Sequence, residues 1–127
     1  QKEVAERIVS KKNKKSYGRL SILAQWRLDC EILFNIMPSC FYPIPKVEST
    51  LVKFTPKRNF IKIKNVKNLE KITSLFFNQR RKKIKNVIKS LMSENNITDK
   101  ISIDLNLRPQ NLSPNFYYNI VKIIESN

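Results

Sequence analysis

The sequence has no histidine, one glycine and only two cysteines among its 127 residues. Without histidine, neither a Cys-His nor a Ser-His catalytic arrangement can be assembled within this chain. Cys30 and Cys40 are isolated rather than paired as Cys-x-x-Cys, so they do not predict a zinc site. We interpret them as two small buried thiols, and we expect no metal site in this chain.

The scarcity of glycine excludes another class of site. Gly18 is the only glycine, whereas a Rossmann fingerprint or a P-loop needs several where the backbone must approach a nucleotide closely.

Long apolar runs are missing too, since no segment approaches the roughly 20 residues of a membrane span. The N-terminus carries Lys2 and Glu3 instead of a signal-peptide core. We therefore expect a soluble protein of the cytoplasm, or of an organelle if the source is eukaryotic, with no membrane partner.

Acidic residues are few compared with basic ones. The chain has 25 Lys and Arg against 10 Asp and Glu, which gives a formal charge of +15. Such a charge raises the local potential and attracts polyanions, so nucleic acid is the expected partner. A basic membrane-surface protein would share this charge, but it would also need an amphipathic anchor or a lipidation signal, and the sequence has neither.

The first half of the chain predicts two helices followed by two strands. Apolar residues at helical spacing indicate helices near residues 4–9 and 20–26, separated by a Lys-rich loop over residues 11–16. The chain begins inside the first helical pattern without an initiator Met, which suggests a fragment of a longer protein. Residues 28–36 predict a buried strand and residues 48–55 a second one, and the two could form the antiparallel edge of a mixed sheet.

The second half predicts helices only. Residues 56–64 are basic and irregular, which makes them the candidate domain boundary. Apolar stripes then indicate helices near residues 69–76 and 84–91, and Ser113 with Pro114 is typical of an N-cap followed by the first helical position. The sequence thus predicts an α/β portion over residues 1–57 and a small all-α domain over residues 58–127.

Within this helical part, five of the nine residues from Asn78 to Asn86 are cationic. No acidic residue occurs from Lys71 to Lys89. Because the apolar stripe continues through the run, we predict a helix that packs one side and presents the other to phosphates. Arginine can make forked contacts to phosphate, whereas lysine acts as a point charge. A solvated charged face is the alternative, and the missing acids favour RNA contact. The predicted RNA-binding residues are Lys46, Gln79, Arg80, Arg81, Lys82, Lys83, Lys85 and Lys89.

Three prolines stiffen the loop between the two predicted strands, because each fixes its own φ and biases the preceding residue toward extended geometry. Phe41 lies in this loop and could offer a flat face on which a flipped-out base stacks, worth about 1–3 kcal/mol by analogy with single-strand binders. An aromatic residue beside prolines is more often a packed turn, so the loop by itself does not decide between the two.

Four motifs together resemble the KsgA-type ribosomal RNA adenine dimethyltransferases in order and spacing, over the first two-thirds of the chain. They are Gln1-Lys2-Glu3-Val4-Ala5-Glu6-Arg7-Ile8, Tyr17-Gly18-Arg19-Leu20-Ser21, Phe41-x-Pro43-x-Pro45-Lys46-Val47-x-Ser49 and Phe77-Asn78-Gln79-Arg80-Arg81-Lys82. The final third, with Asn111-Leu112-Ser113 before the last helix, is similar in pattern but less distinctive.

The resemblance implies an enzyme that transfers methyl groups from S-adenosylmethionine to N6 of two adjacent adenines near the 3′ end of small-subunit ribosomal RNA. It implies that residues 1–57 are the C-terminal end of a Rossmann-like methyltransferase domain, and that residues 58–127 form a helical domain that docks on the ribosomal subunit. Phe41 matches the aromatic that lines the target-adenine pocket. The family's glycine-rich donor motif and its Asn-Leu-Pro-Tyr-type catalytic motif do not occur in this chain, so it holds no catalytic or donor-binding residue and should be inactive alone.

Two other interpretations remain open at this point. The chain could be a free-standing RNA-binding or ribosome-assembly module without a catalytic half. It could also resemble the antibiotic-resistance methylases that act on large-subunit RNA and share the aromatic-x-Pro-x-Pro-basic-Val loop, although the first and fourth motifs favour the small-subunit family. For the full-length protein we expect a monomer whose partner is the small ribosomal subunit.

Overall fold

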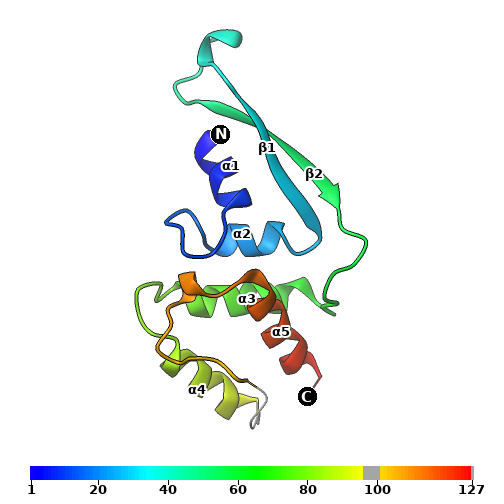
Figure 1. Ribbon diagram of the computed structural model, residues 1–127, viewed down its shortest axis with the longest axis vertical. Helices are drawn as coiled ribbons and strands as arrows, with labels where there is room; N and C mark the ends of the chain where they lie inside the picture. The colour runs from blue at the N-terminus through cyan, green and yellow to red at the C-terminus, as the bar shows by residue number, and fades with distance from the viewer. Residues whose placement is uncertain (96–100, 127) are drawn as a thin grey trace.

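The computed structural model describes residues 1–95 and 101–126 as an extended β-hairpin above a group of packed helices (Figure 1). No helix within these residues is long and apolar enough to span a bilayer. The elements in chain order are α1 (Lys2–Val9), α2 (Arg19–Ala24), β1 (Leu28–Ile36), the 3-10 turn η1 (Pro38–Cys40), β2 (Ser49–Pro56), α3 (Val66–Phe77), α4 (Lys85–Glu94), the 3-10 turn η2 (Pro109–Asn111) and α5 (Pro114–Glu125).

The predicted antiparallel strand pair is confirmed. β1 and β2 form a two-stranded sheet in which Leu28 lies opposite Pro56 and Ile36 lies opposite Ser49. The register shifts between Ile32 and Phe34, which is a β-bulge in β1. α1 packs against both strands near the middle of the hairpin (Figure 1).

The expectation that β1 is a buried strand is wrong for this structure. Phe34 is 56% exposed, and Leu51 opposite it on β2 is 42% exposed. A two-stranded sheet has two faces and two edges, and α1 alone cannot cover them. The expectation of two buried thiols is wrong for the same reason, because Cys30 on β1 is only half-buried and Cys40 in η1 is exposed.

The hydrophobic core lies among the helices, below the hairpin. Ile22 of α2, Leu69 and Phe76 of α3, and Val121 of α5 are almost completely buried. Phe76 sits at the centre of an aromatic group, with its ring centroid 5.2 Å from that of Tyr117 in an edge-to-face arrangement. This core confirms the apolar stripes predicted for the helices around residues 69–76 and 84–91.

Three buried tyrosines fasten the core to loops through their hydroxyl groups. Each hydroxyl donates a hydrogen bond to a backbone carbonyl: Tyr17 to Leu112, Tyr117 to Pro109, and Tyr118 to Ile22. Burial raises the pKa of all three hydroxyls above the ordinary tyrosine value, so they remain neutral donors at physiological pH. Their role is to satisfy buried backbone carbonyls.

The last helix begins where the sequence predicts, but its cap differs from the expected one. α5 starts at Pro114, which occupies the first helical position, and Ser113 is the N-cap residue. The Ser113 side chain makes no capping hydrogen bond. The start is therefore fixed by the preset φ of proline and by burial of Tyr117 in the next turn.

The segment between β2 and α3 is packed against the rest of the molecule. Trp26 donates its indole N–H to the Ile61 carbonyl at 2.7 Å, and its ring meets Phe60 edge to face at 6.0 Å between centroids. Tyr17 and Ile22 from the first predicted portion share one core with the helices of the second. The division of the chain at residue 57 therefore remains a prediction.

Glu125 at the end of α5 binds the beginning of α3. Its carboxylate oxygens accept hydrogen bonds from the backbone N–H of Lys64 at 2.8 Å, from that of Asn65 at 3.0 Å, and from the Asn68 amide at 2.7 Å. Burial acts to raise the pKa of Glu125, but these hydrogen bonds and the Lys64 charge together outweigh it and hold the pKa below its usual value.

We expect Glu125→Gln to lower the free energy of unfolding by about 1 kcal/mol at neutral pH, since an exposed charged hydrogen-bond acceptor is partly screened by water. A carboxyl whose pKa is lowered in the folded state stabilises the protein above its unfolded value, here near 4.5, and stops doing so as the pH falls through the folded value. Urea denaturation of both proteins from neutral to acid pH should therefore show their stabilities converging below pH 4.5. A gap that stays constant with pH would rule out the carboxylate charge as its cause.

Candidate nucleic-acid interface

The cationic cluster forms a turn between two helices, so the expected basic helix through residues 78–86 is wrong. α3 ends at Phe77 and α4 begins at Lys85. After α3 the backbone tightens, with the N–H of Gln79 bound to the Phe76 carbonyl at 3.3 Å and the N–H of Lys82 bound to the Gln79 carbonyl at 3.0 Å. Residues 78–84 are called the basic turn below.

Both ends of the basic turn are anchored in the core. Phe76 is completely buried just before it, and Ile84 at its end is 1% exposed and donates its N–H to the Leu107 carbonyl at 2.9 Å. In the middle, the Arg81 carbonyl accepts a hydrogen bond from Nε of Arg108 at 2.8 Å. The backbone of the turn is therefore held at three points, while its charged side chains other than Arg80 face solvent.

The predicted RNA-binding side chains in this region are exposed, with the exception of Arg80. They are Gln79, Arg81, Lys82 and Lys83 in the basic turn, and Lys85 and Lys89 on the first turns of α4. Among the described residues both ion pairs involve α1, one between Lys2 and Glu48 and the other between Arg7 and Glu3. The positive charge of the basic turn is thus not neutralised by either ion pair and is available to attract phosphates.

Arg80 differs from its neighbours because its guanidinium is engaged within the protein. It donates to the Lys15 carbonyl at 2.6 Å and to the Lys14 carbonyl at 3.4 Å, and its Nε lies 3.4 Å from the Gln110 side-chain oxygen. Nη1 of Arg80 lies 3.6 Å from the position that a Cβ would take at Gly18, so the guanidinium also covers the backbone there.

Phe41 and Lys46 lie in the loop at the tip of the hairpin, at the opposite end of the molecule from the basic turn (Figure 1). Phe41 follows η1, donates its N–H to the Pro38 carbonyl at 3.2 Å, and is 42% exposed. Lys46 is exposed. The structure therefore does not bring the predicted adenine-stacking residue and the predicted phosphate-binding residues into one site.

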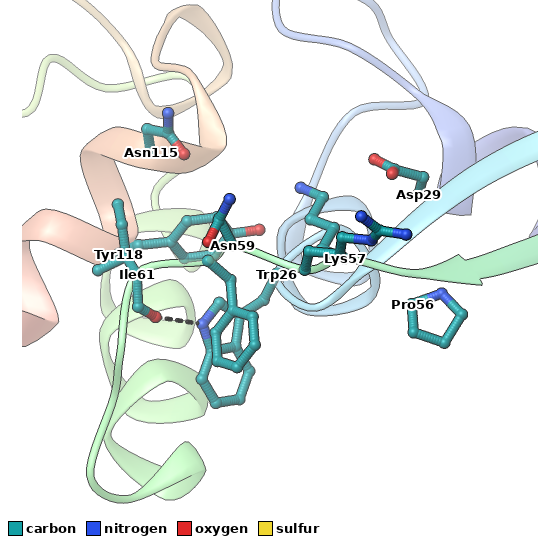
Figure 2. A pocket seen from close by; sticks show the side chains of 10 residues that line it. Trp26, Asp29, Pro56, Lys57, Asn59, Ile61, Asn115 and Tyr118 are labelled. Carbon is teal, nitrogen blue, oxygen red and sulfur yellow. Dashed lines mark hydrogen bonds between the residues drawn. The ribbon is translucent and has the colours of Figure 1, made fainter.

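An open hollow lies beside the segment that joins β2 to α3 (Figure 2). Lys57 in its lining donates to the Gln25 carbonyl at 2.7 Å, and beside it the Arg27 guanidinium lies over the Phe60 ring at 4.6 Å. Trp26 is bound to Ile61, as the dashed line in Figure 2 shows. None of the residues predicted to bind RNA or adenine lines this hollow.

Residues suited to metal binding or to nucleophilic catalysis do not gather in the described part of the chain. No group of three or more Cys, Asp or Glu side chains lies close enough to hold a metal ion there. Burial raises the pKa of the Cys30 thiol, so it is a neutral thiol and a poor nucleophile at physiological pH.

Comparison with known proteins identifies the family. The profile of the family described as Ribosomal RNA adenine dimethylase matches residues 1–126. The chain belongs to this family. It is 51% identical over 126 residues to Ribosomal RNA small subunit methyltransferase A of Pelagibacter ubique, covering 98% of this chain and 48% of that protein. The corresponding protein of Francisella tularensis subsp. novicida is 46% identical over 114 residues, covering 89% of this chain and 44% of the relative.

Two solved structures share the fold of this chain. A dimethyladenosine transferase from Plasmodium falciparum superposes with a TM-score of 0.77 at 21% identity, covering 99% of this chain and 55% of that one. The 23S rRNA methyltransferase ErmE gives a TM-score of 0.50 at 16% identity, covering 96% and 52%. This adenine dimethylase chain thus spans about half the length of the proteins it matches.

Members of this family use S-adenosylmethionine as methyl donor, and the residues present here do not fit it. Gly18 is the one position without a side chain, and its backbone is extended and begins a helix of only six residues. The Arg80 guanidinium lies against it instead of leaving an open cradle. The described part of this chain therefore provides no donor site around Gly18.

Proposed function

We propose that this chain is the C-terminal, RNA-docking portion of an S-adenosylmethionine-dependent enzyme that dimethylates N6 of two adjacent adenines near the 3′ end of small-subunit rRNA. Family membership and the small-subunit names of the relatives support this assignment. The observation that carries the docking role is the basic turn, whose backbone is fixed by the core. Its cations other than Arg80 are exposed and lie outside both ion pairs of the described residues.

In this proposal the two ends of the molecule act on different parts of one RNA. The side chains of Arg81, Lys82, Lys83 and Lys85 neutralise phosphates, and Gln79 and Lys89 border them. At the hairpin tip, Phe41 stacks on the adenine that is being methylated and Lys46 lies beside it. Residues 1–57 belong to the methyltransferase domain, the donor is bound by residues outside this chain, and the chain alone binds RNA without methylating it.

Binding of the chain to two synthetic RNA hairpins tests this function. One hairpin has the sequence of the 3′-terminal helix of small-subunit rRNA, and the other has the sequence of a large-subunit hairpin methylated by resistance enzymes. We expect salt-dependent binding with preference for the small-subunit hairpin. Equal affinity for both would leave only general RNA binding, and preference for the large-subunit hairpin would transfer the assignment to the resistance methylases.

The role of Phe41 predicts a loss of methylation rate in the full-length enzyme. Stacking on an extruded base is worth about 1–3 kcal/mol, so Phe41→Ala should slow dimethylation about 5- to 150-fold. Phe41→Tyr keeps the ring and should retain most of the activity. Ile44→Ala is the matched control, because Ile44 is 67% exposed in the same loop. A Phe41→Ala enzyme as fast as the Ile44→Ala enzyme would show that no base stacks on this ring.

A further inference from the structure

The loop between α1 and α2 is held in one conformation by bonds to distant segments. Asn13 adopts a left-handed backbone conformation with φ of 74° and donates its N–H to the Gln110 carbonyl at 2.7 Å. The Asn111 side chain donates to the Asn13 side-chain oxygen at 3.0 Å. Ser10 and Ser16 share a hydrogen bond of 2.8 Å across the base of the loop. We call residues 11–16 the lysine loop.

Arg80 connects the lysine loop to the basic turn. Its guanidinium spans the two neighbouring carbonyls of Lys14 and Lys15, which lie 66 and 65 residues away in sequence but next to it in space. Both bonds come from Nη2, while Nε of the same guanidinium lies 3.4 Å from the Gln110 side-chain oxygen, so the planar group binds the lysine loop and η2 at once. Arg80 therefore acts on the protein backbone, in contrast to Arg81 beside it, whose side chain is exposed.

A third segment completes the arrangement. Arg108 bonds the Arg81 carbonyl through Nε, and the residues that follow it in η2 hold Asn13. The lysine loop, η2 and the basic turn lie on the same side of the molecule in Figure 1. Three separate stretches of sequence thus form one surface, which carries exposed cations from each of them: Lys11, Lys12, Lys14 and Lys15, Arg108, and Arg81, Lys82 and Lys83.

The acidic groups near this surface are few. Glu3 and Glu6 of α1 line the hollow that also contains Lys14, Lys15 and Arg80. Glu3 is paired with Arg7 at 3.1 Å, and Glu6 is the other carboxylate that lines this hollow. The exposed cations of the three segments outnumber these carboxylates, so the surface suits a ligand with several phosphates in a row.

We propose that the lysine loop is a second phosphate-binding segment for RNA, and that Arg80 is a positioning residue that holds it beside the basic turn. This rests on the proposed RNA-docking function and adds to it. A nucleic-acid backbone presents phosphates at regular spacing, so one strand or the two sides of a helix can contact both cationic segments at once. Arg80 fixes the relative placement of those segments and does not itself contact the RNA.

The salt dependence of RNA binding tests the lysine loop. The probe is the small-subunit hairpin, titrated with the chain at several salt concentrations. Removing one phosphate-binding cation lowers the slope of log K against log salt by about one. We expect Lys14→Gln with Lys15→Gln to lower the slope by about two. The matched control is Lys67→Gln with Lys122→Gln, which removes the same charge from exposed positions on α3 and α5.

A turn variant separates failure of the loop from failure of the docking function. Lys82→Gln with Lys83→Gln should lower the slope by about two as well. If it does so while the loop variant behaves like the control, the loop proposal is overturned and the docking function stands. If native chain does not bind the hairpin, or the turn variant also matches the control, both are overturned. Binding only to anionic phospholipid vesicles would assign the surface to a membrane and overturn both too.

A double-variant cycle tests the positioning role of Arg80. In Arg80→Gln the bonds that hold the lysine loop beside the basic turn are lost. Adding Lys14→Gln and Lys15→Gln should then change the slope of log K against log salt far less than in the native background. Equal changes in the two backgrounds would show that Arg80 does not act through the loop. Arg80→Lys guards against a folding defect and keeps the charge. If Arg80→Lys restores binding but adding Lys14→Gln and Lys15→Gln to it no longer changes the slope, Arg80 acts by its charge alone and the positioning role is overturned.

Discussion

Replacing Phe76 with alanine is expected to lower the free energy of unfolding of the chain by about 3–5 kcal/mol. Phe76 is completely buried, and its ring lies edge to face with those of Tyr117 at 5.2 Å and Phe116 at 5.9 Å. It therefore joins α3 to α5, and its removal both reduces apolar burial and leaves a cavity among rings that cannot collapse freely. Small domains have a total stability of about 5–15 kcal/mol, so this one change removes a large share.

Urea denaturation followed by circular dichroism measures the effect through the shift in midpoint. The matched control is Phe34→Ala on β1, where the same residue type is 56% exposed. Because little burial is removed there, we expect a change within about 1 kcal/mol. A Phe76→Ala protein that unfolds at the same midpoint as the Phe34→Ala protein would mean that the packed helices do not hold the chain together.

Local sequence patterns predicted most of the elements. Apolar residues at helical spacing identified α1, α2, α3 and α4, and the paired strands were expected on either side of a proline-rich loop. Pro114 fixed the start of α5 because proline presets its own φ. These signals lie within a few residues of the structure they predict, so no knowledge of the rest of the chain is needed.

The break between α3 and α4 had no such signal. No proline or glycine stands between Phe77 and Lys85, and the apolar pattern continues at Ile84. In the structure Ile84 is buried through contact with another part of the chain, where its N–H bonds Leu107. The helix therefore ends because of tertiary contacts, which outweigh helix propensity at these positions.

The roles of the neighbouring arginines could not be separated from the sequence either. Arg80 and Arg81 differ because the Lys14 and Lys15 carbonyls lie beside one of them, and that proximity is a property of the fold. Residues Lys11 to Ser16 were correctly expected to be a loop, but their bonds to η2 and Arg80 make that loop part of the cationic surface. A lysine-rich run next to the one glycine was the only local sign of it.

Replacing Arg81, Lys82, Lys83 and Lys85 together with glutamine is expected to weaken binding of the small-subunit hairpin by about several thousandfold at about 0.1 M salt. Each phosphate contact contributes about 0.9 to the slope of log K against log salt, which amounts to nearly tenfold in affinity per contact at that concentration. The slope should fall by about 3.6 at the same time. These four side chains are exposed, so the change should leave the core and the unfolding midpoint nearly unaffected.

The slope and the midpoint together decide how to interpret this result. A large loss of affinity with an unchanged slope would mean that the turn acts by shape or by direct base contacts, because counterion release is the signature of phosphate binding. A lower midpoint would point to a structural role for the cations instead. If affinity and slope both stay at native values, the phosphates lie elsewhere, and the exposed cations of the lysine loop and Arg108 are then the next positions to replace.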